Sequence, residues 1–557
     1  MPSYYDLGNH SRPISTASSD AQLWFDRGLI WTYGFNHEEA IRCFEKACAY
    51  DPNCAMAYWG IAYALGPNYN KPWEAFDDAE LAANLSKAVA LTRRARTLVA
   101  DGTASERALV NALQARYPTE QHPTEQPPPA ATLRQWNDAY AAAMRQAYRA
   151  DPDDLDLAAL FAEALLNRTP WQLWDLRSGE PAEDASTLEA QTVLERALER
   201  TASRAHPGVL HMYIHLMEMS PHPESAARAS DWLRGLCPDA GHLQHMPSHI
   251  DVLCGRYDSA VQQNDQAIAA DAKFLEREGA LNFYSLYRAH NYHFKLYAAM
   301  FLGQSENALA AADGLISTIP DKLLVIDSPP MADWLEAFVP TRMHVLIRFG
   351  RWQEIIDAPL PKDRELFCFT TAVSHYAKGV ALAATGRVDG AEQQRELFEA
   401  TTGRVPETRY LFNNTCIDIL AVAREMLNGE IEYRKQNYDQ AFARLRRAIE
   451  LDDGLPFDEP WGWMQPTRHA YGALLLEQGH VEQAEAVYRA DLGLDPDLPR
   501  PYQHPENVWS LHGYHECLTR LGRDDLARII EQRLRLVAAR ADVPIETSCY
   551  CRTSHAA

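Results

Sequence analysis

Two pairs of histidines share one spacing and follow each other at a fixed interval. His211 and His215 are four residues apart, as are His245 and His249, and the second pair follows the first by 34 residues. Residues four apart lie on one face of a helix, one turn from each other. Two such imidazoles can bind a single ion, as in the zinc-binding helices that carry His-x-x-x-His. The spacing therefore predicts a metal site on helices that recur every 34 residues.

The same interval appears elsewhere in the chain as a pattern of small and aromatic residues. Near the N-terminus the pattern consists of Trp24, Gly28, Ala40, Phe44, Ala47 and Pro52. Near the C-terminus it consists of Gly472, Ala484, Tyr488 and Pro496. These residues fall at the signature positions of the 34-residue tetratricopeptide repeat, which the sequence resembles over roughly residues 20–540. Arg27 departs from the family pattern, which has Leu there.

The resemblance implies an all-α fold of helix–turn–helix repeats, stacked into a right-handed superhelix with a concave groove. Strand signals are scarce, and Asp-Pro pairs such as Asp151-Pro152 provide helix stops. We expect three parts: an N-terminal extension (1–19), a single solenoid (20–540) and a C-terminal tail (541–557). The solenoid includes a Pro-rich loop at 118–131 and His-rich groove repeats at 205–310.

The repeat register places the histidines on one surface. It predicts that the first helices of three repeats begin near Pro207, Gly241 and Ala289. In the family, positions 2, 5 and 9 of such helices line the groove. Seven of these nine positions are histidine: His211, His215, His242, His245, His249, His290 and His293. With 20 histidines in 557 residues, composition alone does not explain this concentration.

Neutral imidazole is a common ligand of copper, iron and zinc, so the cluster predicts a transition-metal site. Glu218 follows His215 by three residues and is a candidate catalytic carboxylate or third ligand. Seven histidines exceed the ligands of one ion, so either two ions bind or some histidines orient the others. Copper or iron is favoured and implies oxidation of a small-molecule substrate, whereas zinc implies hydrolysis.

Two alternatives stay open. The repeat family most often forms scaffolds that hold a peptide or protein partner in the groove, usually through Asn, Lys and Arg rather than His. A groove that binds an acidic peptide through histidine donors is a related alternative. The stretch from His242 to Ile250, His-Leu-Gln-His-Met-Pro-Ser-His-Ile, suggests a His-rich branch of the family.

Further candidates lie toward the C-terminus. His469 and His512 fall at position 5 of later repeats and could close the groove. Cys549 and Cys551 form a Cys-x-Cys pair that could ligate a soft metal, although we expect the tail to be a disordered terminus.

Composition excludes several functions. A net charge of −23 argues against binding to nucleic acid or to anionic lipid. The sequence lacks a phosphate-binding loop and an apolar run long enough to cross a membrane. Ten cysteines are too sparse for a disulfide framework and, without a secretion signal, favour a reducing, cytoplasmic location.

Overall fold

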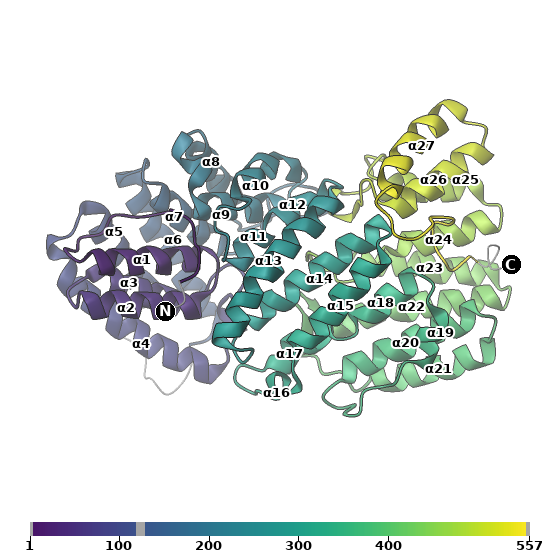
Figure 1. The fold of residues 1–557 in the computed structure, drawn as a ribbon, viewed down its shortest axis with the longest axis horizontal. Helices are drawn as coiled ribbons and strands as arrows, with labels where there is room; N and C mark the ends of the chain where they lie inside the picture. Colours follow the sequence, from purple (N-terminus) through teal and green to yellow (C-terminus); the bar gives the residue numbers. More distant parts are fainter. Residues whose placement is uncertain (1–3, 119–127, 553–557) are drawn as a thin grey trace. The chain divides into compact units, whose positions relative to one another are not determined.

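The computed structural model describes residues 4–118 and 128–552. Its secondary structure is almost entirely helical, which confirms the predicted all-α fold (Figure 1). In the described part, the strands are one short hairpin of β1 (Tyr410–Leu411) and β2 (Asn414–Thr415), antiparallel with Tyr410 opposite Thr415. Most of the predicted Pro-rich loop, residues 119–127, lies outside the described residues.

The chain divides into two compact units. Unit 1 comprises Met1–Ile250 and Ala269–Phe274, and unit 2 comprises Asp251–Ile268 and Leu275–Ala557. The single solenoid predicted for 20–540 stays a prediction.

The helices of the first half are α1 (Ser19–Tyr33), α2 (His37–Tyr50), α3 (Ala55–Ala64), α4 (Asp78–Leu98), α5 (Ala104–Arg116), α6 (Ala130–Ala150), α7 (Leu155–Leu166), α8 (Thr187–Leu198), α9 (Pro207–Glu218), α10 (Ala227–Leu233), α11 (Gly241–His245), α12 (Pro247–Leu253) and α13 (Tyr257–Glu278). Short 3-10 helices are η1 (Trp73–Ala75), η2 (Val99–Asp101), η3 (Thr201–Ala205), η4 (Pro223–Ala226), η5 (Glu336–Phe338) and η6 (Arg500–Tyr502).

The helices of the second half are α14 (Ser285–Leu302), α15 (Ser305–Thr318), α16 (Asp321–Leu324), α17 (Met331–Leu335), α18 (Thr341–Arg348), α19 (Trp352–Asp357), α20 (Cys368–Ala384), α21 (Val388–Thr402), α22 (Cys416–Arg434), α23 (Tyr438–Asp452), α24 (Thr467–Glu477), α25 (Val481–Asp491), α26 (Val508–Arg520) and α27 (Asp524–Ala538).

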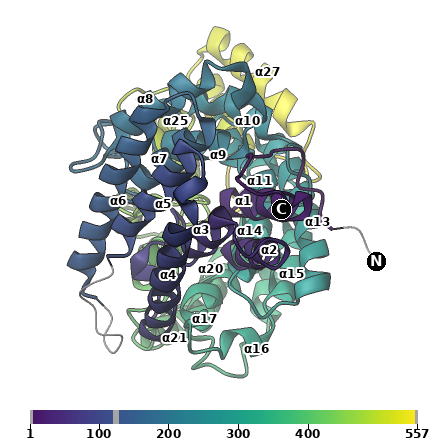
Figure 2. The same cartoon turned by 90° about the vertical axis from the view of Figure 1, so that its left-hand side faces the viewer.

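Consecutive helices pack as pairs, among them α1 with α2, α20 with α21, and α22 with α23. Figure 2 shows α1, α2 and α3 next to one another. The predicted small and aromatic positions explain the close approach. A Cβ atom on Gly28 or on Gly60 would lie 2.6–2.7 Å from the ring of Phe44, so only glycine fits there. Tyr488 repeats this arrangement, since a Cβ on Gly472 would lie 2.7 Å from its ring.

The predicted starts of the His-rich helices hold at two of three positions. Helix α9 begins at Pro207, where His206 caps it by accepting a hydrogen bond from the Val209 amide. Helix α11 begins at Gly241 and ends at His245, and α12 follows from Pro247 because proline supplies no amide hydrogen. Helix α14 begins at Ser285, four residues before the expected start at Ala289.

Residues 541–552 of the C-terminal tail make defined contacts with the rest of unit 2, so the prediction of a disordered terminus is wrong for these residues. The Asp542 carboxylate accepts hydrogen bonds from the amides of Ser305 (2.6 Å) and Glu306 (2.8 Å) at the start of α15. Ser548 and Cys551 are buried. Among the described helices, none combines the length and the apolar character needed to cross a membrane.

Candidate metal centre

Three helices of unit 1 bring five of the seven predicted histidines into its interior. Helix α9 carries His211 and His215, α11 carries His242 and His245, and α12 carries His249. All five side chains are at most 2% exposed, so they form a buried cluster rather than the open wall of a groove. Their burial argues against the predicted contact between groove histidines and an acidic peptide.

Helix α9 packs closely against the end of α1, and this contact positions His211. A Cβ atom on Gly208 would lie 2.6 Å from the ring of Tyr33, so glycine is required where α9 crosses the end of α1. One turn later, Nδ1 of His211 lies 2.6 Å from the backbone carbonyl oxygen of Tyr33. A carbonyl only accepts, so Nδ1 of His211 carries the hydrogen, and Nε2 presents a lone pair to the cluster.

Glu218, the last residue of α9, determines which nitrogen of His215 carries the hydrogen, as the Tyr33 carbonyl does for His211. Its Oε1 atom lies 2.8 Å from Nδ1 of His215, and its Oε2 atom lies 2.7 Å from Nδ1 of His249. The carboxylate accepts from Nδ1 of His215, so Nε2 of that ring is the lone-pair nitrogen. That buried Nε2 atom has no hydrogen-bond partner among the described residues.

The Nε2 atoms of the two α9 histidines, His211 and His215, lie close to the ring of His242. One ring nitrogen each of His211, His215 and His242 lies within 4.8 Å of the others, and Nε2 of His211 is 3.1 Å from Nε2 of His242. Metal–imidazole bonds of about 2.0–2.1 Å in tetrahedral geometry separate ligand nitrogens by roughly 3.3 Å. The His211–His242 distance is close to this value, and the three nitrogens lie near enough together that they could hold one ion with a fourth position open.

The electrostatics of the site lower the pKa of His211 and of His215, which favours their neutral forms. Burial lowers the pKa of His211 well below its ordinary value, and the neighbouring His215 lowers it further. Burial also lowers the pKa of His215, against the opposing effect of Glu218. Although burial alone would raise the pKa of Glu218, His215 and His249 lower it. A neutral imidazole beside an ionised carboxylate is the state in which histidine binds a metal.

Aromatic rings enclose the three histidines. Phe35 lies 4.6 Å from His211 and 5.4 Å from His242 between ring centroids. Tyr69 (4.8 Å) and Trp171 (5.8 Å) lie beside His215. Phe35 and Tyr69 reach the site from loops between helices, so helical periodicity does not predict them.

His245 and His249 form a second pair in unit 1. Their Nε2 atoms are 2.7 Å apart, and Ser248 lies between them in sequence with Oγ 3.3 Å from Nδ1 of His245. The predicted contact of histidines one turn apart is thus present, although the helix is interrupted between α11 and α12.

The remaining two predicted ligands, His290 and His293, lie on α14 in unit 2. His290 contacts the ring of Phe412 edge-on at 4.8 Å. His293 contacts Phe338, and neither of its ring nitrogens has a hydrogen-bond partner among the described residues. Burial lowers the pKa of His293 to about 3. Their part in a metal site stays a prediction.

His469 on α24 belongs to a different network in unit 2. Its Nε2 lies 3.0 Å from the Asp491 carboxylate, and its Nδ1 lies 2.7 Å from a guanidinium nitrogen of Arg348. Both ring nitrogens are thus engaged by protein, which leaves no lone pair for a metal. His512 lies on α26, one turn before Glu516. The Glu516 carboxylate pairs with Arg552 at 2.7 Å.

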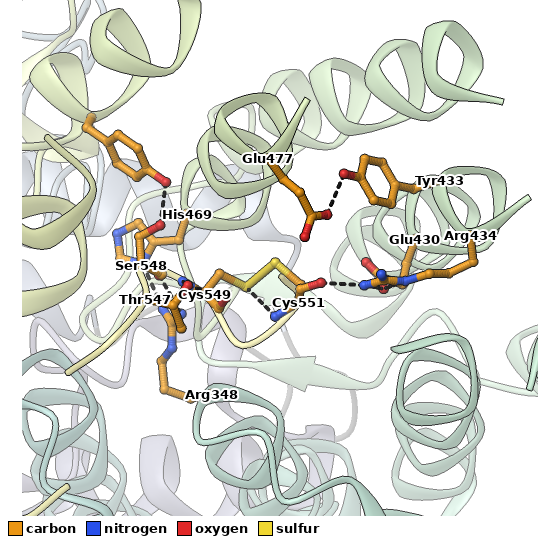
Figure 3. The surroundings of a disulfide bond; sticks show 11 residues. Arg348, Glu430, Tyr433, Arg434, His469, Glu477, Thr547, Ser548, Cys549 and Cys551 are labelled. Carbon is orange, nitrogen blue, oxygen red and sulfur yellow. Dashed lines mark hydrogen bonds and ion pairs between the residues drawn. A yellow bond between two sulfur atoms is a disulfide. The ribbon is translucent and has the colours of Figure 1, made fainter. Parts of the chain in front are cut away.

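Cys549 and Cys551 are joined by a disulfide bond, so neither sulfur is a thiolate ligand in this structure. Figure 3 shows the disulfide in unit 2 together with Arg348, His469 and Arg434. Arg348 donates to the backbone carbonyl of Ser548, and Arg434 donates to that of Cys551. The Cys-x-Cys sequence therefore belongs to a buried chain segment, which corrects its interpretation as a soft-metal site.

Sequence reasoning missed a second cluster in unit 1, formed by His10, Asp156 and His206. Oδ1 of Asp156 lies 3.0 Å from Nε2 of His10 and 3.1 Å from Nε2 of His206, and Tyr33 donates to the same oxygen. Arg12 pairs with the other oxygen at 3.0 Å. Every one of these polar groups has a protein partner, which is typical of a structural network. No local spacing could reveal it, since His10 and Asp156 are 146 residues apart.

Comparison with known proteins identifies one repeat directly. The family model for the tetratricopeptide repeat matches residues 21–54, which correspond to α1, α2 and the turn after them. No curated protein matches the sequence. A solved structure described as Naa15/Naa10 bound to HypK-THB is similar over 93% of this chain and 70% of that chain. Its 12% identity and TM-score of 0.21 carry no argument about fold or function. The match at 21–54 confirms the resemblance found in the sequence: the chain contains a tetratricopeptide repeat.

Proposed function

We propose that the chain is a helical-repeat scaffold that binds a protein or peptide partner. The tetratricopeptide repeat at residues 21–54 is the observation that carries this proposal, together with the packing of successive helices as pairs. Because the histidine cluster is buried, a partner must bind to another surface of the protein.

The outer face of α27 supplies such a surface. Leu526, Ile529 and Leu536 are 48%, 58% and 63% exposed and lie at helical spacing on one face. A helix at the end of a repeat array ordinarily presents a polar outer face to water. Large exposed apolar side chains in this position favour a docking surface.

The test compares the proteins that co-purify with the wild type and with a variant in which this apolar face is made polar. The variant Ile529→Ser/Leu536→Ser should lose a partner that the wild-type protein retains, whereas Leu188→Ser, also 60% exposed, should retain it. Quantitative mass spectrometry of the bound fraction measures the difference. Equal recovery from both variants, or the absence of any reproducible partner, would contradict the proposal.

A second function is supported by the geometry of unit 1. We propose that His211, His215 and His242 bind one transition-metal ion. The observation that carries this proposal is the orientation of the first two rings, whose Nδ1 atoms face Tyr33 and Glu218 and leave both Nε2 lone pairs in the cluster. Glu218 then acts as a positioning residue rather than as a catalytic group.

The identity of the metal decides the chemistry. Imidazole suits copper, iron and zinc alike, and three imidazoles leave a coordination position for water or substrate. Copper or iron would extend the proposal to oxidation of a small molecule, and zinc to hydrolysis. Elemental analysis of untagged protein purified without chelator should find about one equivalent of one of these metals. A protein that is free of metal and takes up none on titration would contradict the proposal.

A further inference from the structure

Unit 2 contains a pocket that is lined wholly by residues of that unit. It encloses about 360 Å³, counting its open mouth, and is lined by aromatic residues and two adjacent carboxylic acids. The aromatic residues are Tyr257, Tyr297, Phe457 and Trp461, and the acids are Asp458 and Glu459. Neither Lys nor Arg is among its lining residues. We propose that this Trp461 pocket binds an alkylammonium group, either of a small amine or of a lysine side chain.

The first support is an acid that lacks a cation. Asp458 is 3% exposed, and Oδ2 accepts weak hydrogen bonds from the amide of Asn413 (3.3 Å) and the side chain of Asn414 (3.2 Å). No basic side chain of the described residues lies within ion-pair distance of it. Burial raises the pKa of Asp458 well above its ordinary value. An ammonium group entering the pocket would stabilise the ionised carboxylate and so oppose this effect of burial.

The second support is an orphaned hydroxyl. Tyr257 is 1% exposed, and its hydroxyl oxygen has no hydrogen-bond partner among the described residues. Buried hydroxyls nearly always have a partner, so an exception that lines a pocket indicates a missing ligand or water. A primary ammonium has three N–H donors, and Tyr257 can accept one of them.

The third support is the orientation of Trp461. Its Nε1 atom donates to the Asp452 carboxylate at 3.0 Å, which fixes the ring. The ring also lines a neighbouring hollow of about 250 Å³, so it borders open space in both hollows. The face of an indole attracts a cation within about 6 Å of the ring centre.

Acidic groups lie around Tyr297 in the pocket wall, and the guanidinium of Arg500 lies near Tyr257. Burial raises the pKa of the Tyr297 hydroxyl well above its ordinary value, and Glu459, Asp452 and Asp491 raise it further. The same negative charges that oppose ionisation of this hydroxyl favour a cation beside it. His504, the one imidazole of the lining, has Nδ1 2.8 Å from Asp491 and is stacked on Phe301.

Calorimetric titration of the full-length protein tests the proposal at constant ionic strength. We expect n-butylammonium to bind with a Kd on the order of 1 mM, and n-butanol, its neutral counterpart, to bind at least about tenfold more weakly. A second arm compares the peptide acetyl-Gly-Lys-Gly-amide with the same peptide carrying norleucine. Binding in the first arm alone identifies a small amine, and binding of the lysine peptide identifies a peptide ligand.

Two variants assign the binding to the pocket. Asp458→Asn keeps the shape of the side chain and should weaken ammonium binding about tenfold, whereas Asp439→Asn, on the exposed start of α23, should leave it unchanged. Tyr257→Phe removes only the orphaned hydroxyl and should weaken binding about threefold, which keeps the test valid if Asp458→Asn does not fold. The proposal is overturned if neither ammonium ligand binds, if the neutral ligands bind equally well, or if folded Asp458→Asn and Tyr257→Phe bind like the wild type.

Discussion

Two histidines at the same predicted repeat position have different surroundings. His211 in unit 1 donates from Nδ1 to a backbone carbonyl and keeps the Nε2 lone pair beside His242. His469 in unit 2 has Nε2 on the Asp491 carboxylate and Nδ1 on Arg348. Asp491 also contacts His504, Asn507 and Ser510, so its network is complete.

The difference shows that repeat position places a histidine in the interior but does not decide its role. The partner of the second ring nitrogen decides it. Where an Asp carboxylate and an Arg guanidinium engage the two nitrogens, the histidine stabilises the fold, and where the second nitrogen faces other imidazoles, the site suits a metal.

Removing the α9 histidines should have the largest effect on this comparison. We expect His211→Ala/His215→Ala to reduce bound metal from about one equivalent to less than a tenth, because two of three ligands are gone. His469→Ala should keep the full metal content of the folded protein. Elemental analysis of both variants measures this, and metal loss in His469→Ala alone would reverse the assignment of the two sites.

Asp491→Ala should strongly destabilise unit 2. It leaves His469, His504 and the Asn507 amide without their shared acceptor, at a cost of about 3 kcal/mol in the free energy of unfolding. Urea unfolding measures the change, with Asp439→Ala as the exposed control. A loss below about 1 kcal/mol would show that the network is not structural.

Glu218→Gln should weaken metal binding about 10- to 100-fold while all ligands remain. The amide keeps the shape of the side chain but no longer holds Nδ1 of both His215 and His249 with full negative charge. Competition with a chelator measures the affinity, and Glu224→Gln on the exposed η4 helix is the matched control. An unchanged affinity would exclude a positioning role for Glu218.

His293, a buried histidine of unit 2, should make the free energy of unfolding depend on pH. Burial lowers its folded pKa to about 3, so below the ordinary value near 6.5 the unfolded chain binds a proton that the folded protein does not. This residue therefore lowers stability as the pH falls, by about 1.4 kcal/mol at pH 5.5. His293→Leu should remove that loss, and the exposed control His222→Leu should not. Equal pH dependence of the wild type and His293→Leu would contradict this.

The sequence predicted local features well and long-range contacts poorly. The helix starts near Pro207 and Gly241, ahead of His211 and His245, follow from the periodicity and were confirmed. The carbonyl of Tyr33 and the ring of Phe35 come from a turn more than 170 residues before His211, and no local pattern indicates them.

The spacing led to wrong predictions for one histidine and one cysteine pair, because their bonding partners cannot be inferred from it. His469 and His211 fit the same register, but the sequence does not show that Asp491 and Arg348 occupy the nitrogens of His469. Cys549 and Cys551 have a spacing that fits both a soft-metal pair and a disulfide, and the structure contains the disulfide.

The most direct test of the metal site is anomalous diffraction from crystals soaked or grown with copper, iron or zinc, recorded at the absorption edge of each metal. The account predicts one peak about 2.0–2.1 Å from Nε2 of His211, His215 and His242. The absence of a peak there, or a peak beside His469 and Asp491 instead, would contradict it.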